Sequence, residues 1–169
     1  MSKYKRIFII GHSGAGKGVL AKKLAETLGW KFINADVFGG FANVGRTQYE
    51  VFGEDGARSF GKCLTDILKY QVTQNNIVVA TDESIICNNS SCDLLKKEFT
   101  LYLEISIPVQ IERLADYRPL LPTANYNLLL QELHKRQNKL YEGVAKHVFN
   151  SDNEGVQSHI EKIKNLIKD

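Results

Sequence analysis

The residues best suited to chemistry lie close to the start of the chain, between Gly11 and Lys17, where the sequence is GHSGAGK. Its glycines allow the backbone to curl, so that successive N–H groups point inward and can bind an anion. Lys17 adds a full positive charge, and a helix that starts there adds the partial charge of its N-terminus. The spacing matches the phosphate-binding loop GxxxxGK, the P-loop, which predicts binding of ATP. The alternative is a glycine-rich turn that binds nothing.

One position departs from the P-loop pattern, which usually continues with a Ser or Thr whose hydroxyl binds Mg²⁺. Gly18 stands there and Val19 follows, so the hydroxyl ligand is missing. We expect Mg²⁺ to be held through water by a carboxylate further along the chain, Asp82 or Asp36. The residues predicted to contact the nucleotide from this loop are Gly11, Ser13, Gly14, Ala15, Gly16, Lys17, Gly18 and Val19.

The elements that must position these residues alternate between strand and helix. Apolar runs predict strands at 7–10, 30–33, 77–80, 101–105 and 148–149. Helical spacing of apolar residues predicts helices at 17–28, 60–68, 94–97, 108–115 and 156–167, and a long helix with Leu133, Leu140 and Val144 on one side. This alternation predicts an α/β fold of three layers, α/β/α, around a five-stranded parallel sheet. We expect one domain over residues 1–169, with 36–48 irregular and a short exposed loop at about 116–127.

Composition excludes several classes of protein. Hydrophobic residues make up 43% and charged residues 24% of the chain, as in ordinary globular proteins. The net charge of +3 is spread along the chain, so we expect no nucleic-acid partner. No apolar run approaches the roughly 20 residues that cross a bilayer. Three cysteines without a CxxC pair disfavour a zinc site or a disulfide framework. We therefore expect a cytoplasmic protein without a membrane partner, a monomer or weak homodimer.

The chain resembles the shikimate kinase family, within the P-loop kinases similar to nucleoside monophosphate kinases. The segments that carry the resemblance are, in order, GHSGAGKG, LAETLGWKFINAD, GEDGAR, VVAT, LYLEIS, RPLL, LYEGVA and NSDN. The resemblance implies a P-loop kinase fold with a lid, and transfer of the γ-phosphate of ATP to a hydroxyl of a small acceptor. It implies that Lys17, Asp36 and Arg118 are catalytic, with Asp36 on the acceptor hydroxyl and Arg118 in the lid. It also implies that Arg58 binds a carboxylate of the substrate and makes Arg113 a candidate for stacking on adenine.

Several departures from the family pattern fall on the acceptor side. Asn34 occupies the place of an Asp that helps to hold the metal, and Gln137 that of a second substrate arginine. Asp82 and Glu83 stand where the family has a run of glycines close to shikimate. Both are candidate substrate contacts, because the ends of parallel strands bind ligands in open α/β sheets. Their negative charge would repel an acidic acceptor, so we expect an acceptor less acidic than shikimate.

Three functions remain open from the sequence. The first is a small-molecule kinase that resembles shikimate kinase. The second is a catalytically weak nucleotide-binding module, an interpretation favoured by Gly18, Asn34 and Gln137. The third is an enzyme similar to nucleoside monophosphate kinases. For Asp82, a structural alternative is a turn at the end of a strand or a cap for the helix near Ser90.

Overall fold

The computed structural model describes residues 2–36, 48–114 and 123–168. For residues 48–52 and 123–125, which begin two of the helices, only the backbone is described. Arg118 and most of the predicted lid lie outside these residues.

A parallel sheet of five strands forms the middle layer of the described chain, in the order β2-β3-β1-β4-β5. Its strands are β1 (Arg6–Ile10), β2 (Lys31–Asn34), β3 (Ile77–Ala80), β4 (Phe99–Glu104) and β5 (His147–Asn150). The central strand β1 pairs with β3 on one side, Ile9 opposite Ala80, and with β4 on the other, Ile9 opposite Leu101. Its apolar run is continuous because helices cover both faces of a parallel sheet. The predicted α/β fold of three layers is confirmed.

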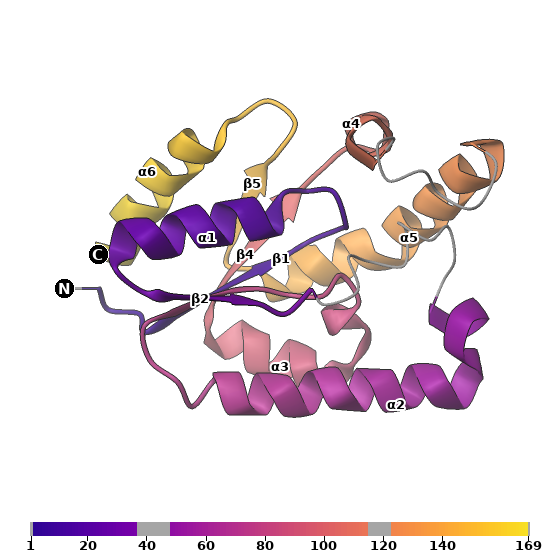
Figure 1. Cartoon of the computed structure of the whole chain (residues 1–169), viewed down its shortest axis with the longest axis horizontal. Helices are drawn as coiled ribbons and strands as arrows, with labels where there is room; N and C mark the ends of the chain where they lie inside the picture. Colours follow the sequence, from indigo (N-terminus) through magenta and orange to yellow (C-terminus); the bar gives the residue numbers. More distant parts are fainter. Residues whose placement is uncertain (1, 37–47, 115–122, 169) are drawn as a thin grey trace.

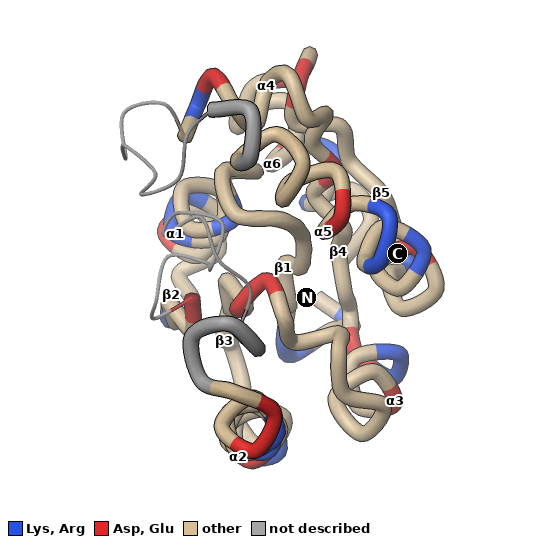
Figure 2. The backbone as a smooth tube through the Cα atoms, turned by 90° about the vertical axis from the view of Figure 1, so that its right-hand side faces the viewer, with Lys and Arg blue, Asp and Glu red and all other residues tan. Residues whose placement is uncertain are grey.

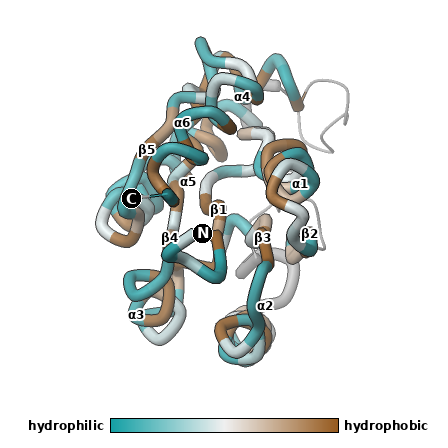
Figure 3. Tube along the Cα trace, turned by 90° about the vertical axis from the view of Figure 1, so that its left-hand side faces the viewer, coloured by the Kyte–Doolittle hydropathy of each residue, from teal (hydrophilic) through white to brown (hydrophobic). Residues whose placement is uncertain are grey.

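The helices divide between the two faces of the sheet (Figure 1). They are α1 (Lys17–Leu28), α2 (Gln48–Gln71), α3 (Asn89–Lys97), α4 (Ile107–Leu114), α5 (Thr123–Val144) and α6 (Val156–Lys168), with a short 3₁₀ helix, η2, at Ile85–Cys87. Leu20 and Leu24 of α1 and Ile160 of α6 join one buried cluster on the sheet. Leu68 of α2 and Tyr141 of α5 join another on the opposite face. Figure 3 shows the hydrophobic residues gathered in the strands, while each helix is hydrophilic on one side.

Two predictions about the helices were wrong in detail. The chain is already helical from Thr123, whereas an exposed loop was expected as far as Asn127. Leu140 was expected on the inner side of α5, but it is 43% exposed, and its neighbour Tyr141 is fully buried. The reason is that the Tyr141 hydroxyl has a partner inside the protein, the backbone oxygen of Glu83 at 2.6 Å. A buried tyrosine needs such a partner, and the pairing fixes the rotation of α5.

The α2 helix is longer than its predicted amphipathic core at 60–68. It begins at Gln48 and has a break at Gly53, whose φ of 71° only glycine adopts readily. The α3 helix likewise begins at Asn89, before the predicted 94. Among the helices of the described ranges, none combines the length and the apolar character that a membrane crossing needs.

Candidate functional site

The phosphate loop connects the carboxyl end of β1 to α1 at the centre of the sheet. Gly11, Gly14 and Gly16 have φ values of 146°, 86° and 93°, a region that side chains strongly disfavour. A Cβ atom at Gly11 would also lie 2.6 Å from the backbone oxygen of Leu103, so the loop could not pass β4 here. The main chain of this loop is therefore shaped by glycine at these positions.

Lys17 is buried and its ammonium is directed back onto the loop. Its Nζ donates to the backbone oxygens of Gly11 (2.9 Å) and His12 (3.0 Å) and lies 3.8 Å from Oδ2 of Asp36. These oxygens stabilise a buried charge that is largely shielded from water. The same charge is placed where a bound phosphate would arrive, at the start of α1.

Side chains from α4 and the end of β5 hold the loop from outside. Arg113 donates through Nη1 to the backbone oxygens of Gly14 (3.2 Å) and Ala15 (3.3 Å) and to Oγ of Ser151 (2.6 Å). Gln110 donates to the backbone oxygen of Ser13 at 2.8 Å. Arg113 thus lies beside the nucleotide loop, as a nucleotide-binding role requires, and its stacking on adenine stays a prediction.

A series of hydrogen-bonded polar side chains lies behind the phosphate loop, and it was not predicted from the sequence. His12 donates to Asn138 (2.5 Å), and Asn138 donates to His134 (3.3 Å). His134 then donates to Gln110 (2.7 Å), the residue that binds Ser13. The two imidazole rings also stack, with centroids 3.9 Å apart. The spacing of His134 and Asn138, one helical turn apart, was the signal that could have placed them on one face of a helix.

This chain of hydrogen bonds needs a neutral His134, because its Nδ1 accepts from Asn138. His12 and His134 each act as donors through Nε2, which leaves Nδ1 of His12 buried without a partner. Burial, with the neighbouring His134 as a second cause, lowers the pKa of His12 to about 3. Burial also lowers the pKa of His134. Both rings are therefore structural at neutral pH and carry no charge.

Three carboxylates gather at the ends of β2 and β3, beside Lys17. Figure 2 shows the two acidic segments next to each other. Asp82 is 1% exposed; its Oδ1 accepts from the backbone N–H (2.9 Å) and the hydroxyl (2.6 Å) of Ser84. Glu83, also 1% exposed, accepts from the backbone N–H of Ser13 at 3.1 Å. Glu83 therefore bonds to the phosphate loop itself.

Burial changes the acidity of this cluster. Burial raises the pKa of Asp36, against the opposing effect of the Lys17 ammonium, and Asp82 raises it further. Burial likewise raises the pKa of Glu83, again against Lys17. One ammonium thus faces three carboxylates, an imbalance that favours a bound cation or a proton at this site.

Two oxygen atoms of the cluster suit a metal ion. Oδ1 of Asp36 and Oδ2 of Asp82 are buried and have no hydrogen-bond partner. Within the described ranges, no group of three or more His, Cys, Asp or Glu side chains could hold a metal. Mg²⁺ in kinases takes one or two carboxylates and completes its shell with water and phosphate. The two unpartnered oxygens therefore fit a Mg²⁺ ion that arrives with the nucleotide.

Asp82 does not cap a helix. The cap of α3 is Asn88, whose side chain accepts from the backbone N–H of Ser90 at 2.9 Å. Within its own turn Asp82 uses only one oxygen, the one bonded to Ser84. The turn therefore accounts for the hydrogen bonds of Oδ1, and Oδ2 remains available to a ligand.

The arginines near the acceptor side point away from a shared anion site. Arg58 is exposed, and its Nη2 lies 3.2 Å from Glu54 and 3.8 Å from Asp55, both on α2. Gln137 is buried, and its Oε1 accepts from the Tyr141 hydroxyl at 3.1 Å. Its neighbour Arg136 is exposed. Arg136 pairs with Glu132 and so does not replace an arginine at 137.

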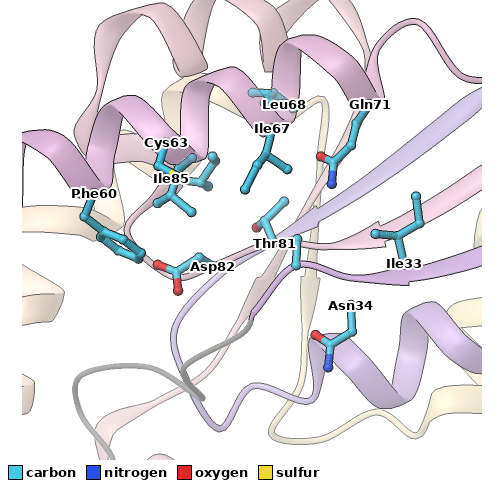
Figure 4. A pocket seen from close by; sticks show the side chains of 12 residues that line it. Ile33, Asn34, Phe60, Cys63, Ile67, Leu68, Gln71, Thr81, Asp82 and Ile85 are labelled. Atoms are coloured by element: carbon cyan, nitrogen blue, oxygen red, sulfur yellow. The ribbon is translucent and has the colours of Figure 1, made fainter.

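A cavity of about 400 Å³ lies between α2 and the ends of β2 and β3 (Figure 4). Asn34 and Asp82 lie at the side of the strand ends, and the apolar residues of α2 face them. A smaller cavity of about 190 Å³ lies between α2 and η2 and includes Arg58 and Ser84. The site thus offers a choice of two places for an acceptor.

Comparison with known proteins gives one family. The family model described as shikimate kinase matches residues 13–168. The shikimate kinase of Actinobacillus pleuropneumoniae serotype 5b is 32% identical over 174 residues, covering 98% of this chain and 99% of the relative. The bifunctional shikimate kinase/3-dehydroquinate synthase of Thermotoga maritima is 33% identical over 137 residues, which are 80% of this chain and 27% of that protein. The shikimate kinase of Acinetobacter baumannii, solved in complex with shikimate, has a TM-score of 0.79 and 27% identity, covering 99% of this chain and 94% of that one.

Proposed function

Because the chain belongs to the shikimate kinase family, we propose that it transfers the γ-phosphate of ATP to a hydroxyl of a small acceptor that lacks a carboxylate. The predicted enzyme class, an ATP-dependent phosphotransferase acting on a hydroxyl, is confirmed by the family. The choice of acceptor is the new part of the proposal. The proposal rests on the charges of the acceptor side. Buried Asp82 and Glu83 stand where the family pattern has glycines, and no arginine among the described residues pairs with these carboxylates.

The phosphate loop and Lys17 hold the β- and γ-phosphates in this proposal. When the nucleotide binds, the Lys17 ammonium donates to phosphate oxygens in place of the backbone oxygens of Gly11 and His12. Its charge therefore has hydrogen-bond acceptors before and after binding. The backbone N–H of Ser13 donates to Glu83, so Glu83 gives up this contact if the N–H binds phosphate. The positions of the loop amides are fixed by glycine conformation, so they need little rearrangement when charge develops.

Asp36 receives the acceptor hydroxyl. Its Oδ2 is 3.8 Å from Lys17, so a hydroxyl bonded to this carboxylate lies next to the phosphate site. A carboxylate at this position can take the proton of the hydroxyl as a general base. Arg118 closes over the transferred phosphate; this role comes from the RPLL segment, which lies outside the described residues.

Mg²⁺ fits the unpartnered oxygens of Asp36 and Asp82, directly or through water. When bound there it would neutralise phosphate charge, as in other kinases. The carboxylates would do for the metal what a hydroxyl at position 18 and an Asp at position 34 do in the family pattern. Asp82 has the geometry for this role because Ser84 binds Oδ1, while the buried Oδ2 has no hydrogen-bond partner.

The test is acceptor-dependent release of ADP from Mg·ATP, with a panel of neutral alcohols, polyols, nucleosides and shikimate. We expect release with at least one neutral alcohol and little with shikimate. Asp36→Asn should reduce turnover by about 10²-fold or more, the usual contribution of a positioned base. Asp93→Asn, an exposed position on α3, is the control and should change nothing. Efficient phosphorylation of shikimate alone would contradict the proposed acceptor.

A second candidate is a nucleotide-binding module with little turnover. It is favoured by the hydrogen bond from the backbone N–H of Ser13 to Glu83, which places a carboxylate against the phosphate loop. The same assay separates the two functions. Tight binding of ATP with no ADP under any acceptor, and no effect of Asp36→Asn on binding, would favour the module.

A further inference from the structure

The larger cavity has an apolar lining with one polar end. Its apolar side chains come from three elements: Ile33 and Ala35 at β2, Phe60, Leu64, Ile67 and Leu68 on α2, and Ile85 on η2. The polar lining residues include Asn34, Thr81 and Asp82 at the strand ends (Figure 4). Within the described part of the lining there is no Lys, Arg or His. A carboxylate placed against these described residues would lose its water without gaining a cation from them.

We propose that this cavity binds the body of the acceptor, and that the acceptor is an alcohol with an uncharged, apolar ring or chain. This inference rests on the proposed kinase function and adds the substrate class. Pockets of about 300–1,000 Å³ with an apolar wall and a few polar groups are typical of small-molecule sites, and the cavity of about 400 Å³ falls in that range.

The polar end of the cavity connects it to the phosphate site. Asp82 lines the cavity, and its Oδ2 is buried without a partner. Two neighbouring polar side chains make hydrogen bonds of their own: Thr81 donates to the backbone oxygen of Ile9, and Oδ1 of Asn34 accepts from the N–H of Asp36. Asp36 in turn lies 3.8 Å from Lys17. An acceptor with its body under α2 therefore presents its hydroxyl beside these two carboxylates and the phosphate loop.

The smaller cavity is the weaker competitor for the acceptor body. At about 190 Å³ it has half the volume, and its arginine is paired with carboxylates of its own helix. Glu54 also lines this smaller cavity, so an acceptor bound there would lie beside a carboxylate. The walls that α2 contributes to the larger cavity are mainly apolar.

The experiment compares matched neutral and charged ligands. Binding of cyclohexylmethanol, benzyl alcohol, cyclohexanecarboxylate and shikimate is measured by calorimetry, and ADP release is measured in parallel. We expect the two alcohols to bind at least tenfold more tightly than either carboxylate. Equal or tighter binding of a carboxylate, or no binding of either alcohol, would overturn the inference.

Ile67→Phe tests the location. Ile67 lines the cavity but is 43% exposed, so a larger side chain there can fill the space without disturbing the core. Leu140→Phe on α5 is the matched control, since Leu140 is also 43% exposed and is absent from the cavity lining. Ile67→Phe should weaken alcohol binding at least tenfold, with ATP binding and the melting temperature unchanged, and Leu140→Phe should not.

The outcomes separate the inference from the proposed function. Alcohol binding that Ile67→Phe abolishes, without any ADP release, supports the cavity as a ligand site and contradicts the kinase function. ADP release with a polar acceptor, unaffected by Ile67→Phe, supports the kinase function and overturns the cavity as its acceptor site.

Discussion

The nucleotide side and the acceptor side of this protein use different parts of the chain to hold a ligand. The phosphate loop relies on main-chain N–H groups, positive φ angles at three glycines, and one ammonium. The proposed acceptor side consists of side chains from α2, η2 and the strand ends, which line the larger cavity. The path of the loop backbone depends on glycine at these three positions, whereas a side-chain site changes its chemistry with each substitution. The difference explains why the loop matches the family pattern closely while the acceptor side carries a new set of charges.

The two sides also differ in how their charged groups are paired. Arg113 is bonded across the loop to Gly14, Ala15 and Ser151, so it supports the nucleotide side. The side chain of Arg58 is 71% exposed, and within the described residues it pairs with Glu54 and Asp55 of its own helix. Exposed pairs of this kind contribute little. The following predictions test this contrast.

Lys17→Ala should produce the largest effect. It removes the ammonium that faces the phosphates and leaves Asp36 without its cation, so turnover should fall by about 10²–10³-fold. ADP release at saturating ATP measures the loss. Lys22→Ala, an exposed lysine on the same helix, is the control. If Lys17→Ala kept more than a tenth of the activity, the loop would not be the phosphate site.

Arg113→Ala and Arg58→Ala compare the two sides directly. Loss of the Arg113 hydrogen bonds to the loop should weaken ATP binding about tenfold, equivalent to roughly 1.4 kcal/mol. Arg58→Ala should change ATP binding and acceptor turnover less than about twofold, because its partners are exposed carboxylates. Calorimetry with ATP and steady-state kinetics provide both numbers. A large effect of Arg58→Ala on acceptor KM would show that a carboxylate clamp persists.

Gly18→Ser should strengthen Mg²⁺ binding on the nucleotide side, because it restores the hydroxyl of the P-loop pattern. A Cβ atom at Gly18 meets nothing within 4 Å, so a serine fits without strain. The Mg²⁺ concentration for half-maximal activity should fall about fivefold, because a hydroxyl oxygen joins the metal ligands. Gly18→Ala is the matched control, since it adds the Cβ without the oxygen. An equal response to both variants would mean that the metal lies away from position 18.

Acid should lower the free energy of unfolding through His12, and this is the smallest of the expected effects. Burial lowers the pKa of His12 from its ordinary 6.5 to about 3. Between these two pH values the unfolded chain binds a proton at His12, whereas the folded protein does not. Stability from this group is therefore present above pH 6.5 and lost as pH falls toward 3, by about 1 kcal/mol between pH 7 and 5.5. The raised pKa values of Asp36 and Glu83 act in the opposite direction, so wild type is compared with His12→Asn.

Urea unfolding at pH 7 and 5.5 measures this difference. The free energy of unfolding should decrease more for wild type than for His12→Asn over this range. Equal pH dependence of the two proteins would show that His12 is protonated in the folded state. His147→Asn is a useful comparison because this histidine lies on β5, away from the loop.

Much of the site could be predicted because its residues belong to local patterns. The GxxxxGK spacing placed Lys17 at the start of a helix, and the apolar run before Asp82 placed it at the end of a strand. The inner side of α5 could not be assigned in the same way. Leu140 is the more hydrophobic residue, yet Tyr141 is the buried one. The Tyr141 hydroxyl donates to the backbone oxygen of Glu83, in the turn that follows β3.

The sequence by itself determined the glycine-shaped loop, the order of strands and helices, and the family, because these follow from the short-range geometry of the backbone and from spacing. Only the tertiary structure decided which carboxylate oxygens lack partners, which arginines face solvent, and that an apolar cavity opens beneath α2. Pairing and burial depend on contacts between residues far apart in the chain. Glu83 and Ser13, for example, are separated by 70 positions and meet only when β3 lies beside β1.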